Sequence, residues 1–85
     1  MHKKRCAIVI IGASGDLARR KLIPALDVLY QKNHLEPGCF IVGTGRSSFT
    51  DEQFRERFDV SPQFTRHLFY HTGLPGLKEY IWSKG

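Results

Sequence analysis

The sequence has few of the residues that would build a metal centre, a disulfide framework or a membrane anchor. It contains only two cysteines, Cys6 and Cys39, and neither belongs to a CxxC or Cys/His pattern. Two cysteines are too few for a disulfide scaffold, so we expect both to be small buried hydrophobic residues. The apolar run from Cys6 ends at Ile11, which is too short for a signal peptide and far short of the roughly 20 residues of a membrane-spanning helix. These absences predict a soluble, cytoplasmic chain with no metal and no membrane partner.

The chain also lacks a long tract of one charge, an internal repeat and any low-complexity segment. Its 85 residues allow one small domain, residues 1–85, and a chain of this size buries only about 60% of its unfolded surface. The net charge of +5 favours an anionic ligand such as a phosphate. Two basic clusters, residues 2–5 and 19–21, would suit a small nucleic-acid-binding protein. They fall at opposite ends of a predicted strand-turn-helix unit, so we expect no nucleic-acid partner.

Two apolar runs joined by an amphipathic segment predict a βαβ unit. The run Cys6 to Ile11 is rich in β-branched residues without polar alternation, which is typical of a strand buried on both faces in a parallel sheet. Apolar residues then recur at helical spacing from Gly15 to about Gln31, and a second buried strand follows at Cys39 to Gly43. Pro24 removes one hydrogen bond inside the helix, so we expect a bend or a loosened turn there.

The second half of the chain predicts shorter elements. Thr50 and Gln53 have the spacing of a capping box, which begins a short helix. A third strand is expected within residues 66–72, and a helical turn within residues 77–82. The predicted fold class is therefore α/β, a partial Rossmann-like parallel sheet that comprises the βαβ unit, the third strand and short helices.

So few layers are expected to leave part of the sheet uncovered. The side chains that we expect to exceed the available core are Phe40, Phe54, Phe58, Leu68 and Trp82. An uncovered sheet also has an exposed edge. The sequence therefore predicts a marginal fold that self-associates.

A glycine-rich turn lies where the first strand leads into the first helix. Its spacing is Gly-x-x-Gly-x-x-Ala, and Ser14 and Leu17 replace the second and third glycines of the common dinucleotide pattern. Gly12 permits a tight turn, Gly15 lets a pyrophosphate approach the backbone, and Ala18 lets the helix pack close to the strand. The helix N-terminus adds a partial positive charge. The turn thus indicates a phosphate site, and the alternative is an ordinary strand-to-helix turn.

The second strand leads into Gly43-Thr44-Gly45-Arg46-Ser47-Ser48. In a dinucleotide fold this segment meets the adenosine ribose, where an acidic residue binds NAD and an arginine accommodates the 2′-phosphate of NADP. No carboxylate occurs between Pro37 and Phe49, and Ser47 can add a hydroxyl donor. Arg46 therefore favours NADP, although it could also be a solvated surface arginine.

Residues 12–26 and 40–47 together resemble the N-terminal coenzyme-binding segment of the glucose-6-phosphate dehydrogenase family. The glycine turn continues into Asp-Leu-x-x-Arg-Lys-Leu-x-Pro, which generic Rossmann proteins do not share, and the match extends from about Ile8 to Phe58. The resemblance implies an NADP-dependent oxidoreductase of glucose metabolism in the pentose phosphate pathway. It implies that Arg46 holds the 2′-phosphate and that the coenzyme phosphates are bound by Gly12, Ala13, Ser14, Gly15, Asp16, Leu17, Ala18 and Arg19.

The resemblance implies less about catalysis. Lys21 matches a lysine that faces the cleft between coenzyme and sugar phosphate in such enzymes, and it could equally be a solvated helix lysine. The family's Glu-Lys-Pro and Asp-His-Tyr-x-Gly-Lys motifs are absent from these 85 residues. We expect His34, His67 and His71 to be surface or strand residues, so no catalytic residue is assigned.

Three functions follow from this reading. The first is the truncated coenzyme-binding part of a glucose-6-phosphate dehydrogenase, which binds glucose 6-phosphate only if the missing region completes it. The second is a non-catalytic NADP-binding or interaction module, and the third is a small nucleic-acid-binding protein. The first two differ in turnover rather than in binding, and the chain alone is expected to be inactive.

Overall fold

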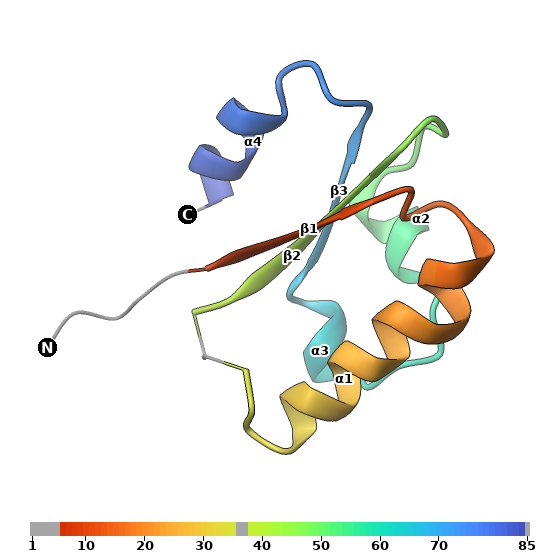
Figure 1. Ribbon diagram of the computed structural model, residues 1–85, viewed down its shortest axis with the longest axis vertical. Helices are drawn as coiled ribbons and strands as arrows, with labels where there is room; N and C mark the ends of the chain where they lie inside the picture. Colours follow the sequence, from red (N-terminus) through yellow and green to blue (C-terminus); the bar gives the residue numbers. More distant parts are fainter. Residues whose placement is uncertain (1–5, 36–37, 85) are drawn as a thin grey trace, which may run out of the picture.

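The computed structural model of the protein describes residues 6–35 and 38–84, in which three parallel strands form one sheet in the order β1, β2, β3. The strands are β1 (Ala7–Ile11), β2 (Phe40–Gly45) and β3 (Leu68–Thr72). Figure 1 shows α1, α2 and α3 gathered to one side of the strands and α4 to the other. The predicted α/β class with a partial Rossmann-like sheet is confirmed. No helix in the described ranges has the length and apolar character needed to cross a membrane.

The first crossover is a continuous helical segment that contains one widened turn. A π-helical turn, η1 (Ala18–Leu22), leads directly into α1 (Ile23–Gln31). The amide of Ile23 donates to the carbonyl of Ala18, five residues earlier, and Pro24 next to it has no amide hydrogen to donate. The loosening expected at Pro24 thus takes the form of this π-helical turn.

Three short helices follow β2. The capping box that begins α2 (Asp51–Arg55) is present: the Gln53 amide donates to Thr50 Oγ1 at 3.1 Å, and the Thr50 amide donates to Gln53 Oε1 at 2.9 Å. The others are α3 (Pro62–Thr65) and α4 (Leu77–Lys84). Buried Asp27 of α1 accepts from the amide of Ser61 at 3.0 Å and from its hydroxyl at 2.8 Å, which fixes the start of α3 against α1.

The main core lies between the sheet and helices α1, α2 and α3. Its fully buried side chains include Ile23 from α1, Phe54 from α2 and Phe64 from α3. The prediction that five large apolar side chains would exceed the core is wrong for Phe40, Phe54, Phe58 and Leu68, which are all buried. Phe54, Phe58 and Leu68 belong to the core cluster that α2 and α3 help to form on one face of the sheet. Phe40 lies edge-on against Phe69, which Lys84 of α4 also contacts. Trp82 does stay exposed, at 75%.

The prediction that the first strand is buried on both faces is also wrong. In β1 only Ile10 is buried, whereas Val9 is 39% exposed and Ile11 is 76% exposed. The reason is the strand order, because β1 lies at an edge of the sheet and β2 lies between its two neighbours. Every residue of β2 except the last is accordingly buried.

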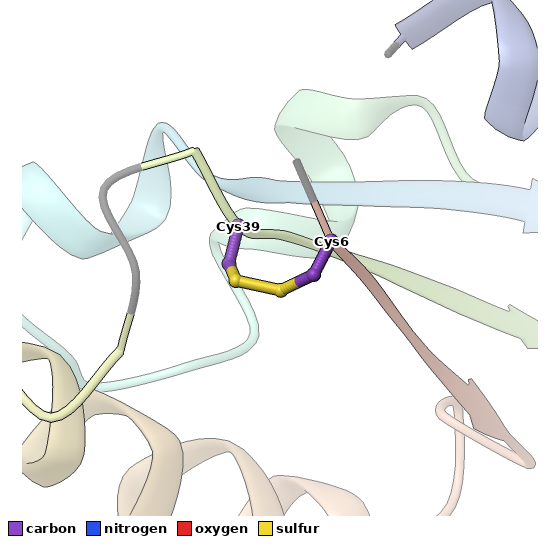
Figure 2. Close-up of a disulfide and its surroundings, with 2 residues drawn as sticks. All are labelled: Cys6 and Cys39. Carbon is purple, nitrogen blue, oxygen red and sulfur yellow. A yellow bond between two sulfur atoms is a disulfide. The ribbon is translucent and has the colours of Figure 1, made fainter. Parts of the chain in front are cut away.

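The two cysteines form a disulfide, which overturns the expectation that they are independent hydrophobic residues. Cys6 and Cys39 precede the paired residues Ala7 and Phe40, so the parallel register places them opposite each other with their Cα atoms 4.5 Å apart. This separation lies within the range that a disulfide spans. Figure 2 shows the bond joining the beginnings of β1 and β2. Cys39 is buried as predicted.

Candidate functional site

A cavity of about 520 Å³ opens at the carboxyl ends of all three strands. Ile11 ends β1, Gly45 ends β2, and Gly73 follows β3. The cavity therefore lies at the carboxyl-terminal end of the sheet, where open α/β folds bind ligands. Its full lining is Ile11, Gly12, Ser14, Gly15, Thr44, Gly45, Arg46, Gly73 and Leu74. Arg46 is the one charged side chain in that lining, so the wall suits an anion.

The glycine turn forms one wall of this cavity and is fixed to β2. The amides of Gly12 and Ala13 donate to the carbonyl of Thr44 at 2.8 and 2.9 Å, and the amide of Gly15 donates to the carbonyl of Gly12 at 3.0 Å. Gly12 has a φ of +78°, a conformation that favours glycine. The turn therefore presents a preformed surface of backbone at the start of the helix.

The predicted phosphate-binding residues divide into three groups. Gly12, Ser14 and Gly15 line the cavity together with Arg46. Ala13 and Ala18 are buried beneath the turn, and they fill space rather than face a ligand. The remaining predicted side chains are exposed outside the lining: Asp16, Leu17, Arg19, Lys21 and Ser47.

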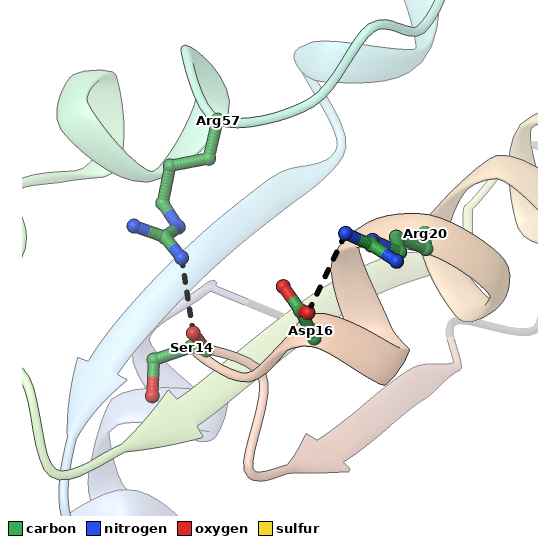
Figure 3. Close-up of polar contacts among 4 residues, drawn as sticks. All are labelled: Ser14, Asp16, Arg20 and Arg57. Atoms are coloured by element: carbon green, nitrogen blue, oxygen red, sulfur yellow. Dashed lines mark hydrogen bonds and ion pairs between the residues drawn. The ribbon is translucent and has the colours of Figure 1, made fainter.

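Asp16 also has a partner of its own. Its carboxylate forms an ion pair of 3.8 Å with Arg20, one helical turn away, and Figure 3 shows the two side chains together. Both side chains are more than 70% exposed, so this pair contributes little to stability. Its effect at the site is to offset the negative charge of Asp16 near the helix N-terminus.

Tyr70 of β3 joins the two loops that carry Ser14 and Ser47. Its hydroxyl donates to the carbonyl of Ser47. It also lies beside Gly45, where a Cβ atom would come within 3.0 Å of the Tyr70 hydroxyl and 2.6 Å of Ser14 Oγ. Burial raises the pKa of Tyr70, and a hydrogen bond from Ser14 and the charge of Arg57 oppose that rise. Tyr70 therefore remains a neutral donor at physiological pH.

Arg57 reaches the glycine turn from the segment after α2. Its Nη2 atom donates to the carbonyl of Ser14 at 3.0 Å, and Figure 3 shows the guanidinium directed at that carbonyl. The same guanidinium lies 4.9 Å from the centre of the Phe49 ring, a cation-π distance. Arg57 was not predicted from the sequence, because it lies 43 positions after Ser14 and no motif connects the two residues.

Sequence reasoning also missed the contribution of the third strand. Gly73 and Leu74 line the cavity, and Thr44 Oγ1 donates to the carbonyl of Gly73 at 2.7 Å. The sequence could have indicated these residues, since the carboxyl ends of parallel strands lie together at one end of the sheet. The three histidines of the described residues are not gathered at the site: His34 is exposed, His67 packs against Tyr30, and His71 forms a hydrogen bond with the carbonyl of Gly73.

A second cavity of about 420 Å³ lies at the other end of the sheet, between the end of α1 and the start of β3. Tyr30, Ser61 and His67 are among its lining residues, and no Lys, Arg, Asp or Glu is. It lacks the carboxyl strand ends and the charge that mark the first cavity, so the first is the candidate site. Within residues 6–35 and 38–84, no cluster of His, Cys, Asp or Glu is suited to holding a metal ion.

Known proteins match this chain over most of its length. The family described as "Glucose-6-phosphate dehydrogenase, NAD binding domain" matches residues 9–73. Glucose-6-phosphate 1-dehydrogenase of Aggregatibacter actinomycetemcomitans is 39% identical over 82 residues, which is 82% of this chain and 17% of the relative. The enzyme of the same name from Bacillus subtilis is 37% identical over 79 residues, with 82% and 16% covered.

Solved structures agree with these relatives. A glucose-6-phosphate dehydrogenase in complex with its substrate glucose-6-phosphate superposes with a TM-score of 0.84 at 31% identity, over 96% of this chain and 21% of that one. The enzyme from Mycobacterium avium gives a TM-score of 0.74 at 28% identity, over 95% and 21%. The chain thus spans about one fifth of those proteins or less. It belongs to the glucose-6-phosphate dehydrogenase family, and residues 9–73 correspond to the NAD-binding domain of that family.

Proposed function

We propose that this chain binds NADP as the coenzyme-binding part of a glucose-6-phosphate dehydrogenase. The observation that carries the proposal is the cavity at the carboxyl ends of three parallel strands, with the glycine turn on one wall and Arg46 in the lining. In a sheet of this kind, a dinucleotide binds across the carboxyl ends of the strands. The family supports a nicotinamide nucleotide, and the choice of NADP rests on Arg46.

The glycine turn is proposed to receive the pyrophosphate. Gly12 and Gly15 present no side chain to the cavity they line, and the helix that begins just after them directs its positive dipole end toward the same space. Ser14 lies between them and adds a hydroxyl. Of the other residues expected at the phosphates, Ala13 and Ala18 would act through packing, and Asp16 and Leu17 through their backbone amides. Arg19 would act through its exposed guanidinium, because its amide donates to the carbonyl of Gly15 at 3.3 Å.

Arg46 is proposed to bind the 2′-phosphate. It follows the last residue of β2, its side chain is exposed, and no carboxylate lines the cavity. An acidic residue at this place would bind the ribose hydroxyls of NAD and repel a phosphate, whereas a guanidinium makes charge-assisted and often bidentate contacts with it. Ser47 is next in sequence and would add a hydroxyl donor.

Oxidation of glucose 6-phosphate is proposed for the enzyme to which this segment belongs, not for the segment alone. Exposed Lys21 would face the sugar phosphate from the helix that follows the turn. A hydride transfer from a sugar hydroxyl also needs a positioned base, and none of the three described histidines lines the cavity. We therefore expect no NADPH formation by the chain by itself. The proposed compartment is the cytoplasm. Because the cytoplasm is reducing, the Cys6–Cys39 bond of the structure would be reduced to two thiols there, and the disulfide-bonded chain is the oxidised form.

The test is calorimetric titration of the chain with NADP and with NAD, repeated on Arg46→Ala. We expect NADP to bind about 10-fold more tightly or better, since a hydrogen-bonded charge contact contributes roughly 1.5 to 3 kcal/mol. Arg46→Ala should remove this preference and leave NAD binding nearly unchanged. Arg66→Ala is the matched control, because Arg66 is exposed just before β3 begins, at the opposite end of the sheet. Equal affinities for the two coenzymes in the parent chain would overturn the proposal.

A further inference from the structure

We infer that Arg57 is a second specificity-determining cation of the coenzyme site, which favours the 2′-phosphate of NADP alongside Arg46. The inference rests on the proposed function and adds a residue to it. Arg57 lies outside the glycine motif and outside the loop that carries Arg46, so its role follows only from where α2 and the segment after it pack.

The position of the guanidinium is fixed from two sides. Its Nη2 atom donates to the carbonyl of Ser14, a residue of the cavity wall, at 3.0 Å. Its Cζ atom lies over the Phe49 ring, 4.9 Å from the ring centre, and Phe49 is three residues beyond Arg46. Arg57 thus bridges the glycine turn and the loop of Arg46, the two walls that the coenzyme would touch.

The charge of Arg57 is not neutralised by a carboxylate in the part of the chain that the structure describes. There, the ion pair between Asp16 and Arg20 is the one ion pair found within 4.0 Å. Burial raises the pKa of the Tyr70 hydroxyl, and the nearby charge of Arg57 is one of the two causes that oppose this rise. That hydroxyl is bound to the carbonyl of Ser47. Arg57 thus contacts Ser14 directly and influences a hydroxyl that is itself bound to Ser47, the residue next to Arg46.

Two consequences for a bound phosphate follow from this geometry. The guanidinium draws the Ser14 carbonyl dipole toward itself, so that its negative end does not oppose an incoming anion. An unneutralised cation within about 10 Å also attracts a doubly charged phosphate, because interactions within one Debye length are only partly screened. NAD carries no such group beside its ribose. The charge of Arg57 should therefore help NADP selectively, by about fivefold in the dissociation constant at moderate salt.

The test separates charge from hydrogen bonding by titrating three variants with NADP and NAD. Arg57→Gln keeps an amide donor for the Ser14 carbonyl and removes the charge, whereas Arg57→Lys keeps the charge. We expect Arg57→Gln to weaken the binding of NADP by about fivefold and the binding of NAD by less than twofold. Arg57→Lys should retain most of the preference for NADP over NAD. Arg57→Met keeps apolar packing on Phe49 and serves as a second neutral variant if Arg57→Gln loses its helical circular dichroism. Arg66→Gln is the exposed control.

Two results would overturn the inference. Equal losses of NADP and NAD binding in Arg57→Gln would mean that Arg57 only shapes the turn, and unchanged binding of both would mean that its charge does not reach the coenzyme. Failure of the proposed function has a different signature, since the parent chain and Arg46→Ala would then both bind the two coenzymes alike. A preference for NADP that depends on Arg46 and is reduced in Arg57→Gln supports both.

Discussion

The two outer strands of the sheet, β1 and β3, differ in how their outward backbone groups are covered. At the β3 edge, side chains of α2 satisfy two of the outward backbone groups: Asp51 Oδ1 accepts from the amide of Tyr70 at 2.9 Å, and Arg55 Nε donates to the carbonyl of Leu68 at 2.8 Å. Tyr80 of α4 donates to the same Asp51 oxygen at 3.4 Å. This edge is thus partly covered by two helices, which interrupts the ladder that it could offer to another strand.

At the β1 edge, by contrast, no strand or side chain of the described residues takes the outward backbone groups. The carbonyl of Cys6 and the amide of Gly12 both bond to β2. Because these directions alternate along a strand, the backbone groups of Ala7, Val9 and Ile11 point to the open edge. The side chains of Val9 and Ile11 are also exposed. What holds β1 is its ladder with β2 and the Cys6–Cys39 bond at its beginning.

The open β1 edge still leaves both ends of the strand held in place. The site lies at the carboxyl ends of the strands, and the hydrogen bonds from Gly12 and Ala13 to Thr44 fix the end of β1 there. The disulfide fixes the opposite end. β1 is therefore held in place at both ends, although its outward side remains exposed. The strand can thus be stable and still be accessible to a partner.

The largest expected effect is the loss of the disulfide. Closing a loop between residues 33 positions apart removes unfolded-state entropy worth about 3 to 4 kcal/mol. Urea unfolding in the presence of a reductant should therefore show a free energy of unfolding lower by about that amount. The double variant Cys6→Ala, Cys39→Ala is the control, since it should be equally destabilised and should not respond to reductant. An unchanged midpoint on reduction would show that the β1–β2 ladder suffices without the bond.

A smaller loss is expected from opening the β3 edge. Asp51→Ala leaves the amide of Tyr70 without its acceptor, which costs about 1 to 3 kcal/mol. Asp51→Asn keeps an acceptor oxygen and should lose less. Both are measured by urea unfolding, with Asp59→Ala as the matched control at an exposed carboxylate. If Asp51→Ala unfolds at the same urea concentration as Asp59→Ala, solvent satisfies the edge and the two edges differ less than their contacts indicate.

The elements of the fold could be predicted from the sequence because local patterns determine them. The β-branched run at residues 7–11 and the Thr50 capping box need no distant partner to be recognised. Burial and pairing could not be predicted in the same way. Whether a run such as residues 7–11 lies at the centre or at an edge depends on strand order, and whether Cys6 meets Cys39 depends on register. Both are properties of the assembled sheet.

The candidate site was predictable to the same extent. Gly12, Gly15 and Arg46 were found because a turn and a strand end identify them within a few residues of sequence. Arg57 depends on the packing of α2 and its following segment against the glycine turn, and no local pattern encodes that contact. Gly73 is an intermediate case. Its place at the site can be predicted once the third strand is known to be parallel to the second.

The smallest effect is expected on self-association, which we propose occurs through the β1 edge. Two copies can pair along the outward groups of this strand, where Val9 is 39% exposed. Val9→Lys would place like charges next to each other at such a pairing, and should weaken association about tenfold, or about 1.4 kcal/mol. Trp82→Lys is the control, because Trp82 is 75% exposed on α4, away from the β1 edge. If association depends on the β1 edge and not on exposed apolar side chains in general, this variant should leave it unchanged. Size-exclusion chromatography with light scattering over a range of concentrations measures both variants. A parent chain that stays at 9.8 kDa throughout would show that the open edge of β1 does not pair with itself.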